Sequence, residues 1–184
     1  LAGGATRGPG EGAEVPPFDA ATETLAETGR SRYDPGLVSK STIWYEPRGA
    51  VIEDPAITTL KGRKVNVLER GGLYRYGYDI RFMNPVEGVR WGGMIKTVTG
   101  LELGGLLSAP PGGGLDFVGR GEVLHADLTF QCRLLPGVYF FNCGVTARID
   151  GADTYLHRGI DAVMFRVLPE TGLRVTGPVD FGEA

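Results

Sequence analysis

Residue types that commonly catalyse reactions are scarce in this chain. It has two histidines, His125 and His157, and contains neither a Gly-x-Ser-x-Gly nor a His-Glu-x-x-His motif. The acidic residues fall mainly at expected strand ends and turns, so no carboxylate pair suits glycoside hydrolysis. Asp150 and Asp153 lie at a predicted turn, and an Asp-Gly turn explains them better than a calcium site does. We therefore predict no catalytic residue, no metal site, no cofactor and no enzymatic activity for this domain.

The two cysteines, Cys132 and Cys143, do not form a recognisable reactive motif. Their spacing suits neither a zinc knuckle nor a redox Cys-x-x-Cys pair. Both fall on the apolar parity of predicted strands. The sequence therefore favours buried free thiols in a reducing compartment, with a disulfide as the alternative.

Side chains that suit a sugar polymer are more frequent. Sugar hydroxyl groups bind planar donors and acceptors, sugar C–H faces stack on aromatic rings, and anionic groups pair with arginine. Outward positions on predicted strands, with the adjoining turns, supply all three kinds. The predicted carbohydrate-binding residues are Arg75, Asp79, Arg81, Trp91, Lys96, Asn142, Thr146, Arg148, Tyr155, His157 and Arg158. For each of them, an ordinary solvent-exposed position is the alternative interpretation.

The stretch His125–Asp150 is the element around which the other predicted strands are arranged. Apolar and polar residues alternate along it, which is the pattern of a strand with one buried face. The apolar set is Ala126, Leu128, Phe130, Cys132 and Leu134 on the first arm, and Tyr139, Phe141, Cys143, Val145, Ala147 and Ile149 on the second. Pro136 and Gly137 interrupt the pattern and supply a bend. We therefore expect a long antiparallel hairpin that needs a second layer over its apolar face.

Further strands are expected before and after this hairpin. Runs of strand-forming residues separated by turn signals cover 41–45, 49–60, 65–68, 74–82, 89–98, 100–107 and 155–167, and Pro55 indicates an edge or a bulge in the second of them. The sugar site is expected on the outward face of one sheet that holds 74–82, 89–98 and the second arm of the hairpin. Trp91 falls on the inward parity of its strand, and a bulge at Gly92 and Gly93 would turn it outward.

The overall composition agrees with an all-β domain. Thirty glycines and twelve prolines among 184 residues favour short strands and tight turns over long helices. A net charge of −3 argues against a nucleic-acid partner, and no apolar run approaches the length of a membrane span. We predict an antiparallel β-sandwich of immunoglobulin-like or jelly-roll type over residues 41–184, with a flexible linker or tether at 1–40. Its core should contain Phe82, Phe130, Phe141, Phe165 and Val167.

Five blocks, in their order and spacing, carry a resemblance to a known family. They are Gly49–Asp54 with a turn at Lys61-Gly62, Tyr78–Phe82, Gly92–Thr97 with Gly100, Leu134–Phe141 with Gly144-Val145, and Asp161–Val167. In these blocks the chain resembles the C-terminal domain of Wzt, the ATPase subunit of bacterial ABC exporters for O-antigen polysaccharide. The resemblance covers roughly two thirds of the chain, and its motifs are mostly fold motifs.

The resemblance implies a non-catalytic module that binds the non-reducing end of lipid-linked O-antigen polysaccharide and selects finished chains for export. It also implies a homodimer at the cytoplasmic side of the bacterial inner membrane. Further implied partners are a nucleotide-binding domain joined through residues 1–40 and the membrane permease subunit. Two alternatives are a fibronectin-like structural or interaction domain, and an accessory domain of a glycan-modifying enzyme such as a glycosyltransferase or methyltransferase.

Overall fold

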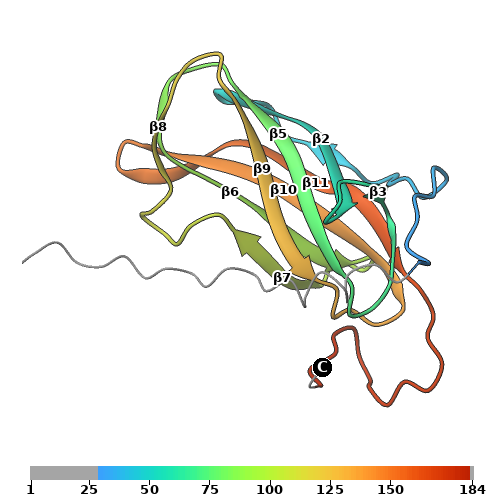
Figure 1. Ribbon diagram of the computed structural model, residues 1–184. Helices are drawn as coiled ribbons and strands as arrows, with labels where there is room; N and C mark the ends of the chain where they lie inside the picture. Colours follow the sequence, from blue (N-terminus) through green and yellow to red (C-terminus); the bar gives the residue numbers. More distant parts are fainter. Residues whose placement is uncertain (1–28, 183–184) are drawn as a thin grey trace, which may run out of the picture.

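The structure, a computed structural model, describes residues 29–182 as two β-sheets packed face to face (Figure 1). The larger sheet has the order β1 (Ile43–Trp44), β11 (Ala152–Val167), β10 (Gly137–Ile149), β6 (Val86–Thr97) and β7 (Glu102–Leu107), with β8 (Leu115–Val118) beside β6 and β4 (Val67–Leu68) parallel to the end of β11. The smaller sheet has the order β3 (Lys64–Val65), β2 (Ala50–Thr59), β5 (Leu73–Phe82) and β9 (Val123–Gln131). The predicted all-β antiparallel sandwich is confirmed. No helix among these residues is long and apolar enough to cross a membrane.

The turn between β10 and β11 follows from its two residues. Asp150 and Gly151 have φ angles of 51° and 79° and form a two-residue loop that joins the paired residues Ile149 and Ala152. A tight hairpin turn with both central residues at positive φ matches the twist of the strands, and Asp-Gly tolerates it. Pro55 marks a second irregularity, because the register of β2 against β5 shifts between Glu53 and Ala56. The bulge expected at Pro55 is therefore present.

The core lies between the two sheets and is rich in aromatic rings. All five predicted core residues are buried: Phe82, Phe130, Phe141, Phe165 and Val167. Tyr76 from β5 stacks on Phe141 from β10 with ring centroids 4.1 Å apart, and Phe130 from β9 meets Phe141 edge-on at 5.2 Å. These contacts join the sheets, and they confirm the strand parity predicted for Phe130 and Phe141. Ile149, which was placed in the same apolar set, is 40% exposed at the end of β10.

The hairpin expected at 125–150 is wrong. The first arm forms β9 and pairs with β5 in the smaller sheet, whereas the second arm forms β10 and pairs with β6 and β11 in the larger sheet. Leu135, Pro136 and Gly137 therefore carry the chain across the core instead of forming a hairpin turn. Alternation shows which face of a strand is buried, but two arms that face each other across a core have the same alternation as two arms that pair.

The same topology separates strands that we expected in one sheet. β5 belongs to the smaller sheet, whereas β6 and β10 are neighbours in the larger one. No single sheet face can therefore hold the outward residues of all three strands, and the predicted position of the sugar site is wrong in this respect.

Residues 29–40, the described part of the predicted linker, contact the sandwich. Arg32 forms an isolated β-bridge with Val67, and the hydroxyl groups of Ser31 and Tyr74 are 2.6 Å apart. The side chain of Asn66 accepts a hydrogen bond from the Asp34 N–H at 2.7 Å. Leu37 is buried as well. Residues 1–28 of the predicted linker lie outside the described residues.

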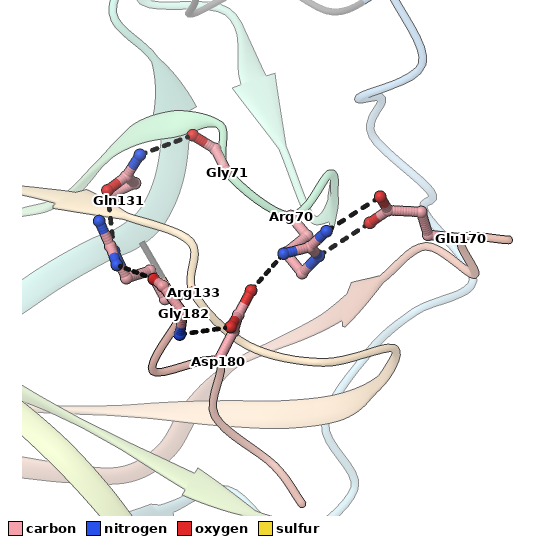
Figure 2. A network of polar contacts seen from close by, with 7 residues as sticks. All are labelled: Arg70, Gly71, Gln131, Arg133, Glu170, Asp180 and Gly182. Carbon is pink, nitrogen blue, oxygen red and sulfur yellow. Dashed lines mark hydrogen bonds and ion pairs between the residues drawn. The ribbon is translucent and has the colours of Figure 1, made fainter. Parts of the chain in front are cut away.

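The C-terminal segment is held by a polar network at the end of the sandwich (Figure 2). The guanidinium of Arg70 pairs with Glu170 at 2.8 Å and also with Asp180. Arg133 donates to the Gly182 carbonyl at 3.1 Å. The hydrogen bond from Arg70 lowers the pKa of Glu170, and the Gly182 N–H lowers the pKa of Asp180. The network ties the chain after β11 to the turn that precedes β5.

Candidate functional site

A groove of about 620 Å³ lies on the outer face of the larger sheet. Its floor and walls come from four adjacent strands, because residues of one parity on each strand share this face. The outward lining residues are Gly105 and Leu107 from β7, Arg90, Gly92 and Met94 from β6, Asn142, Gly144 and Thr146 from β10, and Tyr155 and Arg158 from β11.

Two glycines form the floor of the groove. Gly92 and Gly144 are paired across β6 and β10, so two side chains are missing at adjacent positions. A Cβ at Gly92 would lie 2.6 Å from the Leu107 Cδ2, and a Cβ at Gly144 would lie 2.9 Å from the Tyr155 Cε1. The Leu107 side chain therefore lies against Gly92 and the Tyr155 ring against Gly144, and the two side chains form opposite walls of the groove.

Tyr78 supports this floor from the core side. Its hydroxyl oxygen lies 2.7 Å from the Gly92 carbonyl and 3.0 Å from the Gly144 carbonyl, and it accepts the Gly92 N–H at 3.1 Å. Burial raises the pKa of Tyr78, so the hydroxyl stays protonated and able to donate at neutral pH. A residue of the smaller sheet thereby fixes the backbone under the groove.

The wall formed by β11 combines a cation with aromatic rings. The Arg158 guanidinium lies 5.5 Å from the centroid of the Tyr45 ring and 5.2 Å from that of Tyr155. The Tyr45 N–H donates to the Arg158 carbonyl at 3.0 Å, which places Tyr45 next to β11. Tyr155 is 51% exposed, so its ring is accessible from the groove. A flat ring beside a guanidinium can contact both the C–H face and the hydroxyl groups of a sugar.

The part of the groove nearer β6 is polar. Arg90, which is 9% exposed, forms an ion pair with Asp153. Asn142 accepts the Asp161 N–H at 2.9 Å through its Oδ1, and Asp161 pairs with Lys96 at 2.7 Å. These contacts hold side chains of three strands in fixed positions beside the floor.

Five of the eleven predicted site residues line the groove. Asn142, Thr146, Tyr155 and Arg158 do so on the outward parity of their strands, whereas Trp91 is on the inward parity of β6. Lys96 is on the same sheet but takes part in the buried pair with Asp161. Arg148 lies beyond the groove near the end of the sheet, where its guanidinium donates to the Gly112 carbonyl at 2.8 Å.

Three predicted residues lie on the other sheet. Each has a partner of opposite charge or a hydrogen-bonding partner on a neighbouring strand: Arg75 with Asp127 at 3.6 Å, Asp79 with His125 at 2.7 Å, and Arg81 with Glu53 at 3.0 Å. They are separated from the groove by the full thickness of the sandwich.

Two of the predicted residues face inward. Trp91 is paired with the core residue Val145 and packs against the core, and the register of β6 on β10 is continuous from Arg90 to Thr97. The bulge expected at Gly92 and Gly93 is therefore absent. His157 is buried and accepts the Ile52 N–H at 2.8 Å through its Nδ1, so its side chain bridges the two sheets.

Several groove residues were absent from the predicted site. They are Tyr45, Arg90, Gly92, Met94, Leu107 and Gly144. Glycine within a strand can mark a place where something approaches the backbone closely, and this signal was present at both floor positions. It could not be used from the sequence alone, because the pairing of Gly92 with Gly144 depends on the order of strands. Among residues 29–182, no cluster of three or more His, Cys, Asp or Glu side chains could hold a metal ion.

Comparison with known proteins gives one clear result. The family model of the Wzt C-terminal domain matches residues 41–181. A crystal structure of the C-terminal domain of Wzt is similar with a TM-score of 0.70 and 24% identity, over 80% of this chain and 89% of that chain. At that identity, the structural similarity shows the fold alone.

The other comparisons add little. The crystal structure of Spo0M, a sporulation control protein from Bacillus subtilis, has a TM-score of 0.37 and 11% identity, over 66% of this chain and 50% of that chain, which is too distant to bear on fold or function. No curated protein matches the chain in sequence.

Proposed function

Because this chain belongs to the Wzt C-terminal domain family, a non-catalytic part of an ABC ATPase that serves O-antigen export, we propose that its groove binds O-antigen polysaccharide. We propose further that the ligand is the non-reducing end of the lipid-linked polymer, so that finished chains are selected for export. Among the predicted residues, the proposal retains Asn142, Thr146, Tyr155 and Arg158. To these it adds Arg90, Met94 and Leu107 as contacts, with Gly92 and Gly144 as the floor between the Leu107 and Tyr155 walls.

One observation supports this proposal most directly: paired glycines open a groove between an aromatic wall and an aliphatic wall. Tyr155 and Leu107 offer surfaces for sugar C–H groups, while Arg90, Asn142 and Thr146 offer groups for sugar hydroxyls. The volume of about 620 Å³ falls in the range of small-molecule sites. A site of this size suits a short terminal segment better than many repeat units.

The proposal places the domain in the exporter described by its family. The domain works at the cytoplasmic side of the bacterial inner membrane and pairs with a second copy. Residues 1–40 lead from the nucleotide-binding domain, which in turn acts on the membrane permease subunit. The contacts of residues 29–40 with the sandwich support an anchored C-terminal end of this connection.

Substitution of the floor tests the groove without removing any polar contact. In Gly144→Ala the new Cβ meets the Tyr155 ring, so the ring must leave its place beside the floor. We expect binding of the source bacterium's purified O-polysaccharide to weaken by about tenfold or more, the scale of one good aromatic contact. Calorimetric titration measures this change.

The matched control is Gly104→Ala on β7, an edge strand of the same sheet, where a new Cβ meets nothing within 4 Å. It should bind the polysaccharide as the parent does. If Gly144→Ala also binds like the parent while its melting temperature is unchanged, the polysaccharide does not occupy this groove.

A further inference from the structure

Cationic side chains outnumber carboxylates among the residues that line the groove, with Arg90 and Arg158 against Glu102. Three carboxylate groups lie in or near it, and two of them already have cationic partners: Asp153 pairs with Arg90, and Asp161 pairs with Lys96. Glu102 is the only carboxylate among the lining residues, and it is on β7, at the opposite side of the sheet from β11. The β11 side of the groove is therefore left with positive charge that no lining carboxylate balances.

Arg158 provides most of this excess. Its side chain makes no ion pair or hydrogen bond to any other residue between 29 and 182; its contacts are the rings of Tyr45 and Tyr155. Rings on the guanidinium restrict its motion and remove water from its faces, but they do not accept its five N–H donors. The N–H donors of Arg158 are therefore not used by the part of the chain that the structure describes, and they are available to an anionic group in the groove.

Arg90 provides a second set of donors beside the first. One of its terminal nitrogens pairs with Asp153, while its Nε is buried and has no acceptor among the described residues. Arg90 is paired with Thr146 on β10, and Arg158 is paired with Gly144 two residues away, so the two arginines lie on opposite sides of the same part of the floor. Buried donors without partners are rare in folded proteins, and this one belongs to a residue that lines the groove.

Resting on the proposed function, we infer that the polysaccharide segment in the groove carries an anionic group, a carboxylate or a phosphate, which Arg158 binds. A planar guanidinium binds either oxyanion through two parallel hydrogen bonds. The C–H face of the same sugar stacks on Tyr155, and Arg90 donates to an oxygen of the adjoining unit. Neutral polysaccharides lack the group that matches this wall and bind more weakly.

The test combines protein variants with chemically altered ligand. The probes are the source bacterium's O-polysaccharide in native form, after carbodiimide and borohydride reduction of its carboxyl groups, and after removal of phosphate esters with aqueous hydrofluoric acid. The proteins are the parent, Arg158→Gln, Arg158→Lys and Arg148→Gln. Arg148 is the matched control, because it is an exposed arginine of the same sheet that lies outside the groove.

We expect Arg158→Gln to weaken binding of the native polymer by about ten- to a hundredfold, the value of a charged hydrogen bond, with Arg148→Gln unchanged. One of the two chemical treatments should weaken binding to the parent by a similar factor, and its identity tells carboxylate from phosphate. That treatment should have little further effect on Arg158→Gln, and Arg158→Lys should bind with intermediate affinity.

Two results would overturn the inference: parent-like binding by Arg158→Gln, or no loss of affinity after either treatment. Thermal melting of each variant shows whether it is folded, and Arg158→Lys keeps the test valid if the glutamine variant is not. The binding result for Gly144→Ala shows whether a negative result overturns only the anionic ligand group or also the proposed function of the groove. If Gly144→Ala loses binding and Arg158→Gln does not, the groove binds a neutral sugar; if neither does, the groove is not the site.

Discussion

The imidazole of His157 is a core group, although its residue type suggested a surface or a site. Its Nδ1 accepts the Ile52 N–H from the facing sheet at 2.8 Å, and its ring stacks on Trp44 with centroids 5.3 Å apart. Burial lowers the pKa of His157, and the backbone of Tyr45 opposes that shift in part. The neutral form is therefore the form that the fold favours.

The lowered pKa of His157 determines how the stability of the fold depends on pH. The unfolded chain binds the proton near pH 6.5 and the folded chain only at lower pH, so the stabilisation is present above pH 6.5 and is lost as the pH falls below it. We expect the free energy of unfolding to decrease between pH 7.5 and 5.5, with a slope from this group of at most about 1.4 kcal/mol per pH unit. Urea denaturation at a series of pH values measures that slope.

His157→Asn retains an acceptor for the Ile52 N–H but cannot take up a proton in this range. The slope between pH 7.5 and 5.5 should be reduced in this variant. His125→Asn, which changes the exposed histidine on β9, is the control and should keep the slope. A slope that persists in His157→Asn would assign the pH dependence to other groups.

At the scale of elements, residues 31–37 are part of the packed domain, although their sequence shows no periodic apolar pattern. Residues 31–37 bond to polar groups of the sandwich: the Tyr74 hydroxyl, the Asn66 side chain and the backbone of Val67. Short polar segments of this kind have no periodic apolar face. Their binding partners, among them Asn66, Val67 and Tyr74, are brought together only by the fold.

Two truncations distinguish this segment from what precedes it. Removing residues 1–30 should change the melting temperature little, because the segment has almost no periodic apolar residues. Removing residues 1–40 should lower the free energy of unfolding by on the order of 2–4 kcal/mol, since it exposes the surface under Leu37, removes the partners of the Asn66 side chain and removes Ser31 from the Tyr74 hydroxyl. Thermal melting compares the two proteins, and equal melting temperatures would contradict the expectation.

At the scale of the whole molecule, the sandwich depends on rings that meet between the sheets. Phe130, on an edge strand of the smaller sheet, contacts Tyr74 of its own sheet and Phe141 of the other, with centroids 6.0 and 5.2 Å apart. Because β9 and β10 do not pair, such contacts are what hold the two arms of the stretch 125–150 together.

Phe130→Ala should therefore lower the free energy of unfolding by about 3–5 kcal/mol, the usual cost of removing a buried ring. Val123→Ala, which shortens an exposed side chain on the same strand, is the control and should cost about 0.5 kcal/mol or less. Urea denaturation measures both. A small loss for Phe130→Ala would mean that the ring is not an essential part of the inter-sheet packing.

Much of the fold was predictable from sequence, because burial and turn chemistry act locally. Alternation identified the buried faces of β5, β9 and β10, and the Asp150-Gly151 pair located the turn before β11. Phe141 and Phe165 were placed in the core by parity alone. Of the groove, parity identified Asn142, Thr146 and Arg158 as residues that face outward.

Strand order was decided only in the tertiary structure. A strand with one apolar face can bury it by lying beside or opposite another strand, and the period of two is the same in both arrangements. For this reason β9 and β10 were expected to pair, although they face each other, and Arg81 was expected beside Lys96, although a sheet separates them. The groove is formed by Gly92 and Gly144, which are paired, and by Tyr155 and Leu107, which lie on either side of them. These residues become neighbours only when β6, β7, β10 and β11 are adjacent in the folded sheet.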